Sequence, residues 1–339
     1  MSSLLGADHA ERDRAHHADP LAAVYSALDE RGIPWLLLRG GWERDRSGTD
    51  VDLLVDDEAL EQASQAIDEV GFRRLFAPGR GPHRFFVRYL EAEGRWLKLD
   101  VVDAIAFGRY HELTTNAAAG VLARRRRHAG LAVSSADDAF WALLLHCLLD
   151  KGAVAPSQRG ALAAHAAAAR THTELAGLVE EAVHGEPARL VALARAGDWS
   201  RLEAAGTDLG REWRRRHGSG ARARALVNRA LRRAGSVPRA ARLPTVELRA
   251  PEPVASASVA ALRRACPFPV RAARSPVGLR LRERRGHVGV VIVEPRAPRR
   301  LGADISLGVD GGADPATAAR EISALVWQGM ATRSGAVGV

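Results

Sequence analysis

The chain has 339 residues and a formal net charge of +9 at pH 7, and only two of its 49 basic residues are lysines, Lys98 and Lys151. A Walker A phosphate loop needs a lysine after a glycine-rich turn, and neither lysine has that setting, so kinases and ATPases of the P-loop type are excluded. Abundant alanine and arginine with almost no lysine is typical of a GC-rich bacterial genome, so the positive net charge is weak evidence for a nucleic-acid partner.

Charge is unevenly spread along the chain. Residues 1–115 carry 14 basic and 21 acidic side chains, whereas residues 116–339 carry 35 basic and 19 acidic ones. This split predicts an acidic N-terminal part that attracts metal ions and a basic remainder that could hold polyanions.

Cysteine usage and hydropathy predict a cytoplasmic protein without a membrane span. Cys147 and Cys266 are far apart and have no second cysteine or histidine at metal-ligand spacing, so we expect two reduced thiols. The longest apolar run, residues 140–149, is too short to cross a bilayer. Residues 1–19 are polar and are expected to form a disordered tail.

The pattern of residues 20–115 predicts a compact α/β unit. Asp19 and Pro20 begin a helix that ends at Gly32, and a buried strand over 34–38 then runs into a double-glycine turn. A second strand is expected over 49–55, followed by a helix that Gly71 ends. Two further strands are expected over 83–90 and 95–102.

Residues 116–240 are expected to be mainly helical. A short hairpin is expected within 121–133, a buried helix over 135–150, and an alanine-rich helical stretch over 161–183. The spacing of apolar residues in 223–234 predicts an amphipathic helix with its arginines on the solvated side.

Residues 245–339 are expected to form a small α+β domain. A strand is expected before Pro253, a helix over 259–265, and a hairpin that joins 279–284 to 287–293. Asp314 and Pro315 begin a last helix that reaches about Met330. The whole fold is thus predicted as α/β plus α: a small mixed-sheet core, a helical domain over 116–240 and this C-terminal domain.

Three aspartates carry the main chemical signal. Alternate residues of a strand share a face, so Asp50 and Asp52 are expected to point away from the core, and Asp100 does the same on its strand. Pairing of the two strands would gather three carboxylates, which repel one another unless a cation joins them. Hard oxygen ligands suit Mg²⁺ or Mn²⁺, and two such ions can clamp an in-line phosphoryl displacement. Asp103 is a rival third acid, but it lies at the strand end.

These motifs resemble the DNA polymerase β-like nucleotidyltransferase superfamily. Its signature is a hydrophobic strand, Gly-Gly or Gly-Ser, a spacer, an Asp-hydrophobic-Asp strand and a third acid on a later strand. The corresponding segments here are residues 37–40, 49–55 and Asp100. With the Leu-His stretch of 143–146 and the Asp-Lys-Gly of 150–152, they resemble more narrowly the bacterial nucleotidyltransferase family proteins of glycan and natural-product gene clusters.

The resemblance implies transfer of NMP from an NTP to a hydroxyl or phosphate of a small-molecule, sugar or peptide acceptor, with release of pyrophosphate. It implies that Asp50, Asp52 and Asp100 hold Mg²⁺ or Mn²⁺ and that Asp100 can act as a general base. Gly40 and Gly41 would cradle the β- and γ-phosphates. The resemblance covers residues 20–155 well, and some members carry a thymidylate kinase-like domain whose phosphate loop cannot exist here, because no lysine follows Lys151.

Three basic residues are further candidates for nucleotide binding. Arg39 adjoins the glycines, Lys98 shares the face of Asp100, and Lys151 follows the second motif. Each has an alternative interpretation: Arg39 and Lys98 as exposed side chains, and Lys151 as the cation that favours a helix C-terminus.

Two other functions stay open. The arginine run 124–127 and the eleven arginines of 211–242 could bind RNA, such as a tRNA end, as the acceptor. The fold could also be a non-catalytic nucleotide-binding module, although a scaffold has little reason to keep three uncompensated carboxylates.

Overall fold

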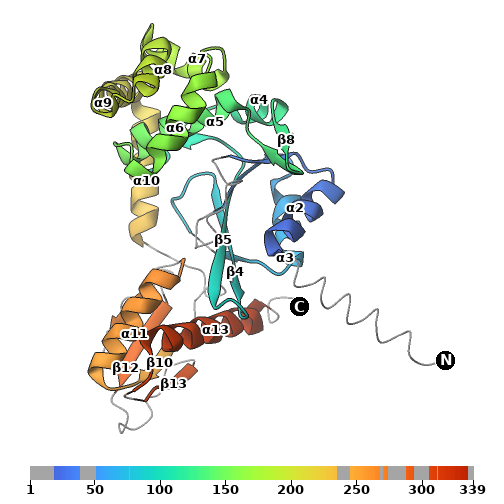
Figure 1. Cartoon of the computed structure of the whole chain (residues 1–339), viewed down its shortest axis with the longest axis vertical. Coiled ribbons are helices and arrows are strands. Elements are labelled where there is room, and N and C mark those ends of the chain that lie inside the picture. The colour runs from blue at the N-terminus through green and yellow to red at the C-terminus, as the bar shows by residue number, and fades with distance from the viewer. Residues whose placement is uncertain are drawn as a thin grey trace, which may run out of the picture.

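The structure is a computed structural model that describes residues 19–38, 51–75, 77–234, 245–267, 270–273, 288–293, 305–310 and 312–334. Figure 1 shows a central sheet with two N-terminal helices beside it, a group of helices at one end and a C-terminal unit of strands and helices at the other. Within the described part of the chain, no helix is long and apolar enough to cross a membrane.

A seven-stranded mixed sheet forms the centre of the molecule. Its strands are β1 (Trp35–Leu37), β2 (Val51–Val55), β3 (Arg73–Leu75), β4 (His83–Leu90), β5 (Arg95–Val102), β8 (Arg126–His128) and β9 (Leu131–Val133). They lie in the order β3-β4-β5-β2-β1-β9-β8. The pairs β2–β5 and β1–β9 are parallel, and the other neighbours are antiparallel.

The helices α2 (Pro20–Glu30) and α3 (Leu60–Glu69) pack beside the sheet and close its main core. The predicted start of α2 is confirmed: Asp19 Oδ1 accepts the backbone N–H of Leu21 at 3.1 Å, and Pro20 is the first helical residue. The face of β5 made by Leu97, Leu99 and Val101 belongs to this core, so the side chains between them point to the opposite face.

A group of helices lies at one end of the sheet, beside the β8–β9 hairpin that completes it. It consists of α4 (Ala118–Ala123), α5 (Ala136–Leu145), the π-helix η1 (His146–Lys151), α6 (Pro156–Ala168), α7 (Glu174–Ala182), α8 (Glu186–Ala196), α9 (Trp199–Arg216) and α10 (Gly218–Ala234). A separate two-stranded sheet, β6 (Ala106–Phe107) with β7 (Leu113–Thr114), joins the central sheet to these helices. The predicted helical character and the hairpin within 121–133 are confirmed.

Helix α10 is turned opposite to the orientation that we predicted. Arg224, Asn228 and Arg232, one turn apart, donate hydrogen bonds inward to the carbonyls of Glu112, Tyr110 and Gly79, respectively. Its large apolar side chains face outward, with exposed fractions of 65% at Leu226, 55% at Val227 and 40% at Leu231. The predicted amphipathic pattern is present. Its polar side faces the protein because backbone carbonyls of two loops accept its hydrogen bonds, and the amino-acid composition does not reveal those acceptors.

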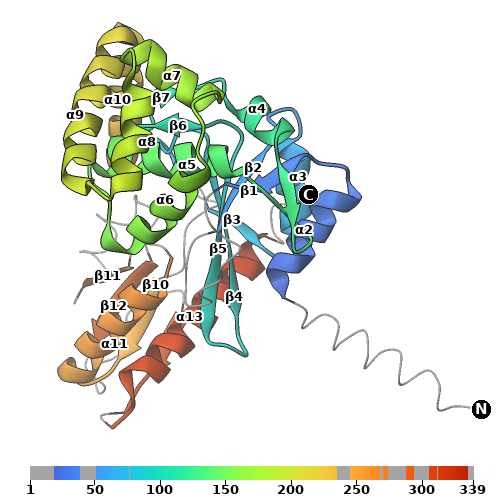
Figure 2. The same ribbon diagram turned by 45° about the horizontal axis from the view of Figure 1, so that its top comes forward.

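The C-terminal unit is a four-stranded sheet with two helices (Figure 2). It contains β10 (Thr245–Arg249), α11 (Glu252–Ala265), β11 (Val270–Ala273), β12 (Val288–Val293), β13 (Ile305–Gly308) and α13 (Pro315–Ser334). The strand order is β11-β12-β10-β13, and each pair is parallel.

Parallel pairing changes one prediction for this unit. We expected β12 to form a hairpin with 279–284, a segment outside the described residues; instead β12 has β11 on one side and β10 on the other, both parallel. The turn from β10 to α11 consists of Ala250 and Pro251.

The C-terminal unit packs against the outer end of the β4–β5 hairpin. The Tyr89 hydroxyl donates to the Arg320 carbonyl at 3.0 Å, and the Trp96 ring meets the edge of Trp327 at a centroid distance of 6.0 Å. Tyr89, Trp96 and Val87 belong to the core of this unit rather than to the main core. The sheet face opposite the main core is therefore covered at one end by the C-terminal unit. The predicted fold class, a mixed-sheet α/β core with a helical region and a small C-terminal unit, is confirmed.

We expect Arg124→Ala to destabilise the protein by about 2–4 kcal/mol, because it leaves a buried carboxylate without its cation. Arg124 donates to both oxygens of Asp138, at 2.9 and 3.1 Å, and the Asp138 side chain has no exposed surface. Urea unfolding measures the change. As a control, Arg211→Ala removes an exposed pair with Asp208 and should change stability by less than about 0.5 kcal/mol; equal losses in the two variants would contradict the prediction.

Candidate active site

Asp52 and Asp100 lie directly opposite each other on adjacent strands. Strands β2 and β5 are parallel, and their register pairs Asp52 with Asp100. Neighbouring strands are about 4.8 Å apart, and residues in register point to the same face. Asp52 is half-buried and Asp100 is only 8% exposed. The two carboxylates therefore occupy adjacent positions on the sheet face opposite Leu99 and Val101, as the strand alternation predicted.

The remaining members of the predicted signature, Arg39, Gly40, Gly41 and Asp50, lie outside the described residues. The residues on either side of this segment are described, and both lie beside the backbone of Asp52. The Leu38 N–H donates to the Asp52 carbonyl at 3.0 Å, and Val51 is paired with Leu99 on β5. The segment that carries the double glycine therefore leaves and re-enters the described structure beside Asp52.

Asp100 has a histidine partner that the sequence analysis did not single out. His83 begins β4, the antiparallel neighbour of β5, and its Nδ1 lies 2.7 Å from Oδ1 and 2.9 Å from Oδ2 of Asp100. Both side chains are 11% exposed. A carboxylate accepts hydrogen bonds and cannot donate them, so the proton of this bond resides on Nδ1.

The donor set fits a divalent cation with hard oxygen ligands. Two carboxylates in register present several lone pairs on one sheet face, and His83 occupies only part of the capacity of Asp100. Among the described residues, no three His, Cys, Asp or Glu side chains gather closely enough to hold a metal ion. The predicted third ligand, Asp50, lies outside that part of the chain.

The structure separates Asp100 from its rival. Asp103 follows the last residue of β5 and has no register partner on β2, whereas Asp100 is within the paired segment. Burial raises the pKa of the half-buried Asp103 carboxyl above its ordinary value, and the nearby Asp57 adds to the increase. Its position away from Asp52 makes Asp103 the poorer partner for a shared cation.

The two lysines differ in their distance from this pair. The Lys98 ammonium lies 4.7 Å from the centre of the Phe85 ring, and Phe85 is opposite Asp100 in the β4–β5 register. Lys98 therefore shares the sheet face of Asp100, two residues along β5. Lys151 is exposed and ends η1, and no described contact joins it to Asp52 or Asp100.

The segment 143–152, which carries the Leu-His and Asp-Lys-Gly motifs, contacts a loop beside the site, residues 108–112. The Asp150 carboxylate accepts the Gly108 N–H at 2.6 Å and also contacts His146 Nδ1 at 2.6 Å. His146 is thus a satisfied structural histidine that helps to hold Asp150. The ring of His111 in this loop packs on the ring of His83 with a centroid distance of 4.2 Å.

Sequence reasoning missed His83 and His111 because neither belongs to a recognisable motif. The available signal was the position of His83 at the start of an alternating strand, two residues before Phe85 on the same face. His111 had no comparable signal, since its loop is placed by contacts with distant helices.

Arginines of the two basic runs are extensively used in internal contacts. Arg124 binds Asp138 and Glu174, and Arg127 binds Asp29. Further pairs along α9 and its neighbour loop are Arg211–Asp208, Arg215–Glu212, Arg216–Glu212 and Arg214–Glu112. These contacts weaken the interpretation of the runs as a polyanion-binding face.

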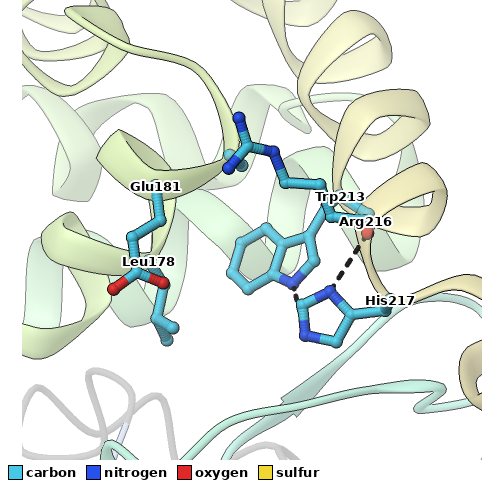
Figure 3. Close-up of a pocket in the computed structure, with 6 residues that line it drawn as sticks. Leu178, Glu181, Trp213, Arg216 and His217 are labelled. Carbon is cyan, nitrogen blue, oxygen red and sulfur yellow. Dashed lines mark hydrogen bonds between the residues drawn. The ribbon is translucent and has the colours of Figure 1, made fainter.

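The structure also has a hollow between α7 and α9, lined by residues other than those of the candidate site. Leu178, Glu181 and Ala182 line one side, and Trp213, Arg216 and His217 line the other (Figure 3). The Trp213 carbonyl and ring nitrogen both contact the His217 imidazole, at 3.1 and 3.4 Å. The hollow contains none of the predicted site residues.

No protein-family model matches the chain, and no curated protein sequence matches it. Two solved structures align with it. The solution structure of the antibiotic-resistance factor ANT(2'')-Ia shares 20% identity over 59% of this chain and 96% of that one, with a TM-score of 0.31. The crystal structure of JHP933 from Helicobacter pylori shares 14% identity over 63% of this chain and 96% of that one, with a TM-score of 0.27. Superpositions this distant do not assign a family.

We expect His111 to make stability fall as the pH is lowered from 7.5 to 5. Burial lowers the pKa of His111 from 6.5 to about 3, and the neighbouring His83 and Arg232 add to the decrease. Below pH 6.5 the unfolded chain therefore binds a proton that the folded protein excludes, so stability decreases, by about 1–2 kcal/mol at pH 5.

The variant His111→Asn removes this titration, and asparagine tolerates the positive φ of 53° found at this position. Urea unfolding at the two pH values measures the effect. Between pH 7.5 and pH 5 the variant should lose about 1–2 kcal/mol less stability than the unmodified protein. Identical losses would show that His111 takes up its proton in the folded state.

Proposed function

We propose that the protein is a metal-dependent nucleotidyltransferase. It transfers NMP from an NTP to a hydroxyl or phosphate of a small-molecule, sugar or peptide acceptor and releases pyrophosphate. The observation that carries the proposal is the register of β2 and β5, which sets Asp52 opposite Asp100. Two carboxylates side by side repel each other, and a bound divalent cation removes that penalty.

In this proposal Asp52 and Asp100, with Asp50, hold Mg²⁺ or Mn²⁺, which supplies charge neutralisation for the phosphates when bound. Asp100 also accepts the proton of the acceptor hydroxyl. Gly40 and Gly41 bring backbone N–H groups to the β- and γ-phosphates, a role supported by the position of Leu38 and Val51 beside the backbone of Asp52. Arg39 adjoins Gly40 in the sequence and Lys98 is two residues from Asp100 on β5, and we assign both to phosphate binding.

The arrangement favours a small acceptor over RNA. A protein that binds RNA through its backbone needs arginines available to phosphates, and several arginines of the basic runs already bind carboxylates or carbonyls of their own chain. We propose that the helical region, residues 116–240, contributes nucleotide and acceptor binding, and that residues 20–115 carry the chemistry.

The decisive variants are Asp52→Asn and Asp100→Asn, which keep the size of each side chain and remove its charge. We expect each to weaken binding of Mg²⁺ and NTP by at least about 10-fold and to lower pyrophosphate release by about 100-fold or more, because each removes a charge that neutralises the metal. Calorimetry with each of the four NTPs measures binding without knowledge of the acceptor.

The control is Asp208→Asn on α9, an exposed carboxylate that pairs with Arg211. It should bind nucleotide as the unmodified protein does. Unchanged Mg²⁺–NTP binding in both site variants, or no NTP binding by the unmodified protein, would refute the proposed function.

A further inference from the structure

The contact between His83 and Asp100 restricts the orientation of one carboxylate of the candidate site. His83 Nδ1 lies 2.7 and 2.9 Å from the two carboxylate oxygens, and it approaches from β4, on the side of Asp100 away from Asp52. A carboxylate on a strand otherwise rotates freely about its last bond. The Nδ1–H bond selects one rotation and leaves lone pairs for a cation.

His83 is itself held by His111. The two rings are 4.2 Å apart between centroids and tilted by 47°. The pKa of about 3 at His111 means that its ring stays neutral and adds no charge beside His83. His111 adopts a left-handed backbone with a φ of 53°, a conformation that costs a non-glycine residue energy and persists only where its surroundings enforce it.

The surroundings of His111 come from three directions. A Cβ atom at Gly81, where φ is +61°, would lie 2.9 Å from the His111 Cβ, so only glycine fits against the ring. Asp150 of η1 accepts the Gly108 N–H, and Asn228 of α10 donates to the Tyr110 carbonyl at 2.8 Å. The 108–112 loop is thus anchored at both the π-helix and α10.

From these contacts we infer that His83 is a positioning residue for Asp100 and that the 108–112 loop, through His111, holds His83 in place. The helical region then acts on the site from a distance: η1 and α10 fix the loop, the loop packs on His83, and His83 sets the carboxylate. Groups that support a metal ligand in this way typically change metal affinity 10- to 100-fold when they are removed.

The inference rests on the proposed function, and it is tested by Mn²⁺ binding in the absence of nucleotide, followed by electron paramagnetic resonance. His83→Leu removes the hydrogen-bond donor and keeps an apolar side chain of similar size. We expect it to weaken Mn²⁺ binding about 10- to 100-fold. His83→Asn places an amide N–H near the position of Nδ1, and it should retain Mn²⁺ affinity within about 3-fold. His184→Leu, at a histidine with a 97% exposed side chain, is the matched control and should bind as the unmodified protein does.

Three results separate the possible outcomes. If His83→Leu binds Mn²⁺ as tightly as the unmodified protein while Asp52→Asn loses binding, the inference is wrong and the proposed function stands. If the unmodified protein binds neither Mn²⁺ nor Mg²⁺–NTP, the proposed function fails first; if it binds Mn²⁺ only together with NTP, the same variants are compared in the presence of NTP, with the same expected result. If His83→Leu does not fold, as judged by its far-UV circular dichroism, His83→Ala replaces it, and retained affinity in that folded variant overturns the inference equally.

Discussion

Two aspartates in register on adjacent parallel strands are the constraint around which the rest of the structure is arranged. Asp52 and Asp100 face the same way about one strand spacing apart, and Asp100 is nearly buried. Like charges at that separation repel each other. At Asp100 the described structure compensates the charge in part through the Nδ1–H of His83. A divalent cation shared by the two carboxylates would compensate it further.

The helical region contributes to this constraint through the loops beside the carboxylates. Its inward-facing polar groups, Asn228 and Arg232 of α10 and Asp150 of η1, bind backbone atoms of Gly79 and of the 108–112 loop. Neutral and charged donors to buried carbonyls fix a loop more firmly than apolar contact does, because each bond has a direction. The outward apolar face of α10 follows from the same geometry, since a helix that uses its polar stripe to hold loops must turn its leucines to solvent.

Local periodicity was sufficient to predict the elements and the face on which the aspartates lie. Strands β2, β4 and β5 were expected within a few residues of their observed bounds, and the alternation in β5 put Asp100 opposite Leu99 and Val101. Short strand β3 was not predicted, because three residues are too few for a periodic signal. The parallel pairing of β12 and the inversion of α10 were not predictable either, since both depend on which distant backbone groups need partners. His83 was inside a correctly predicted strand, but its role became visible only when the β4–β5 register brought it to Asp100.

The C-terminal unit extends the same logic to the far end of the β4–β5 hairpin. A hairpin of two eight-residue strands is marginally stable alone, and the carboxylate-bearing strand β5 is one of its two strands. Trp96 lies four residues before Asp100 on the same face of β5, and Tyr89 is its partner on β4. Both side chains are buried in the core of the C-terminal unit. In the described structure the unit packs on the outer end of the hairpin whose strand β5 presents Asp100, as the 108–112 loop packs on His83 of the neighbouring strand.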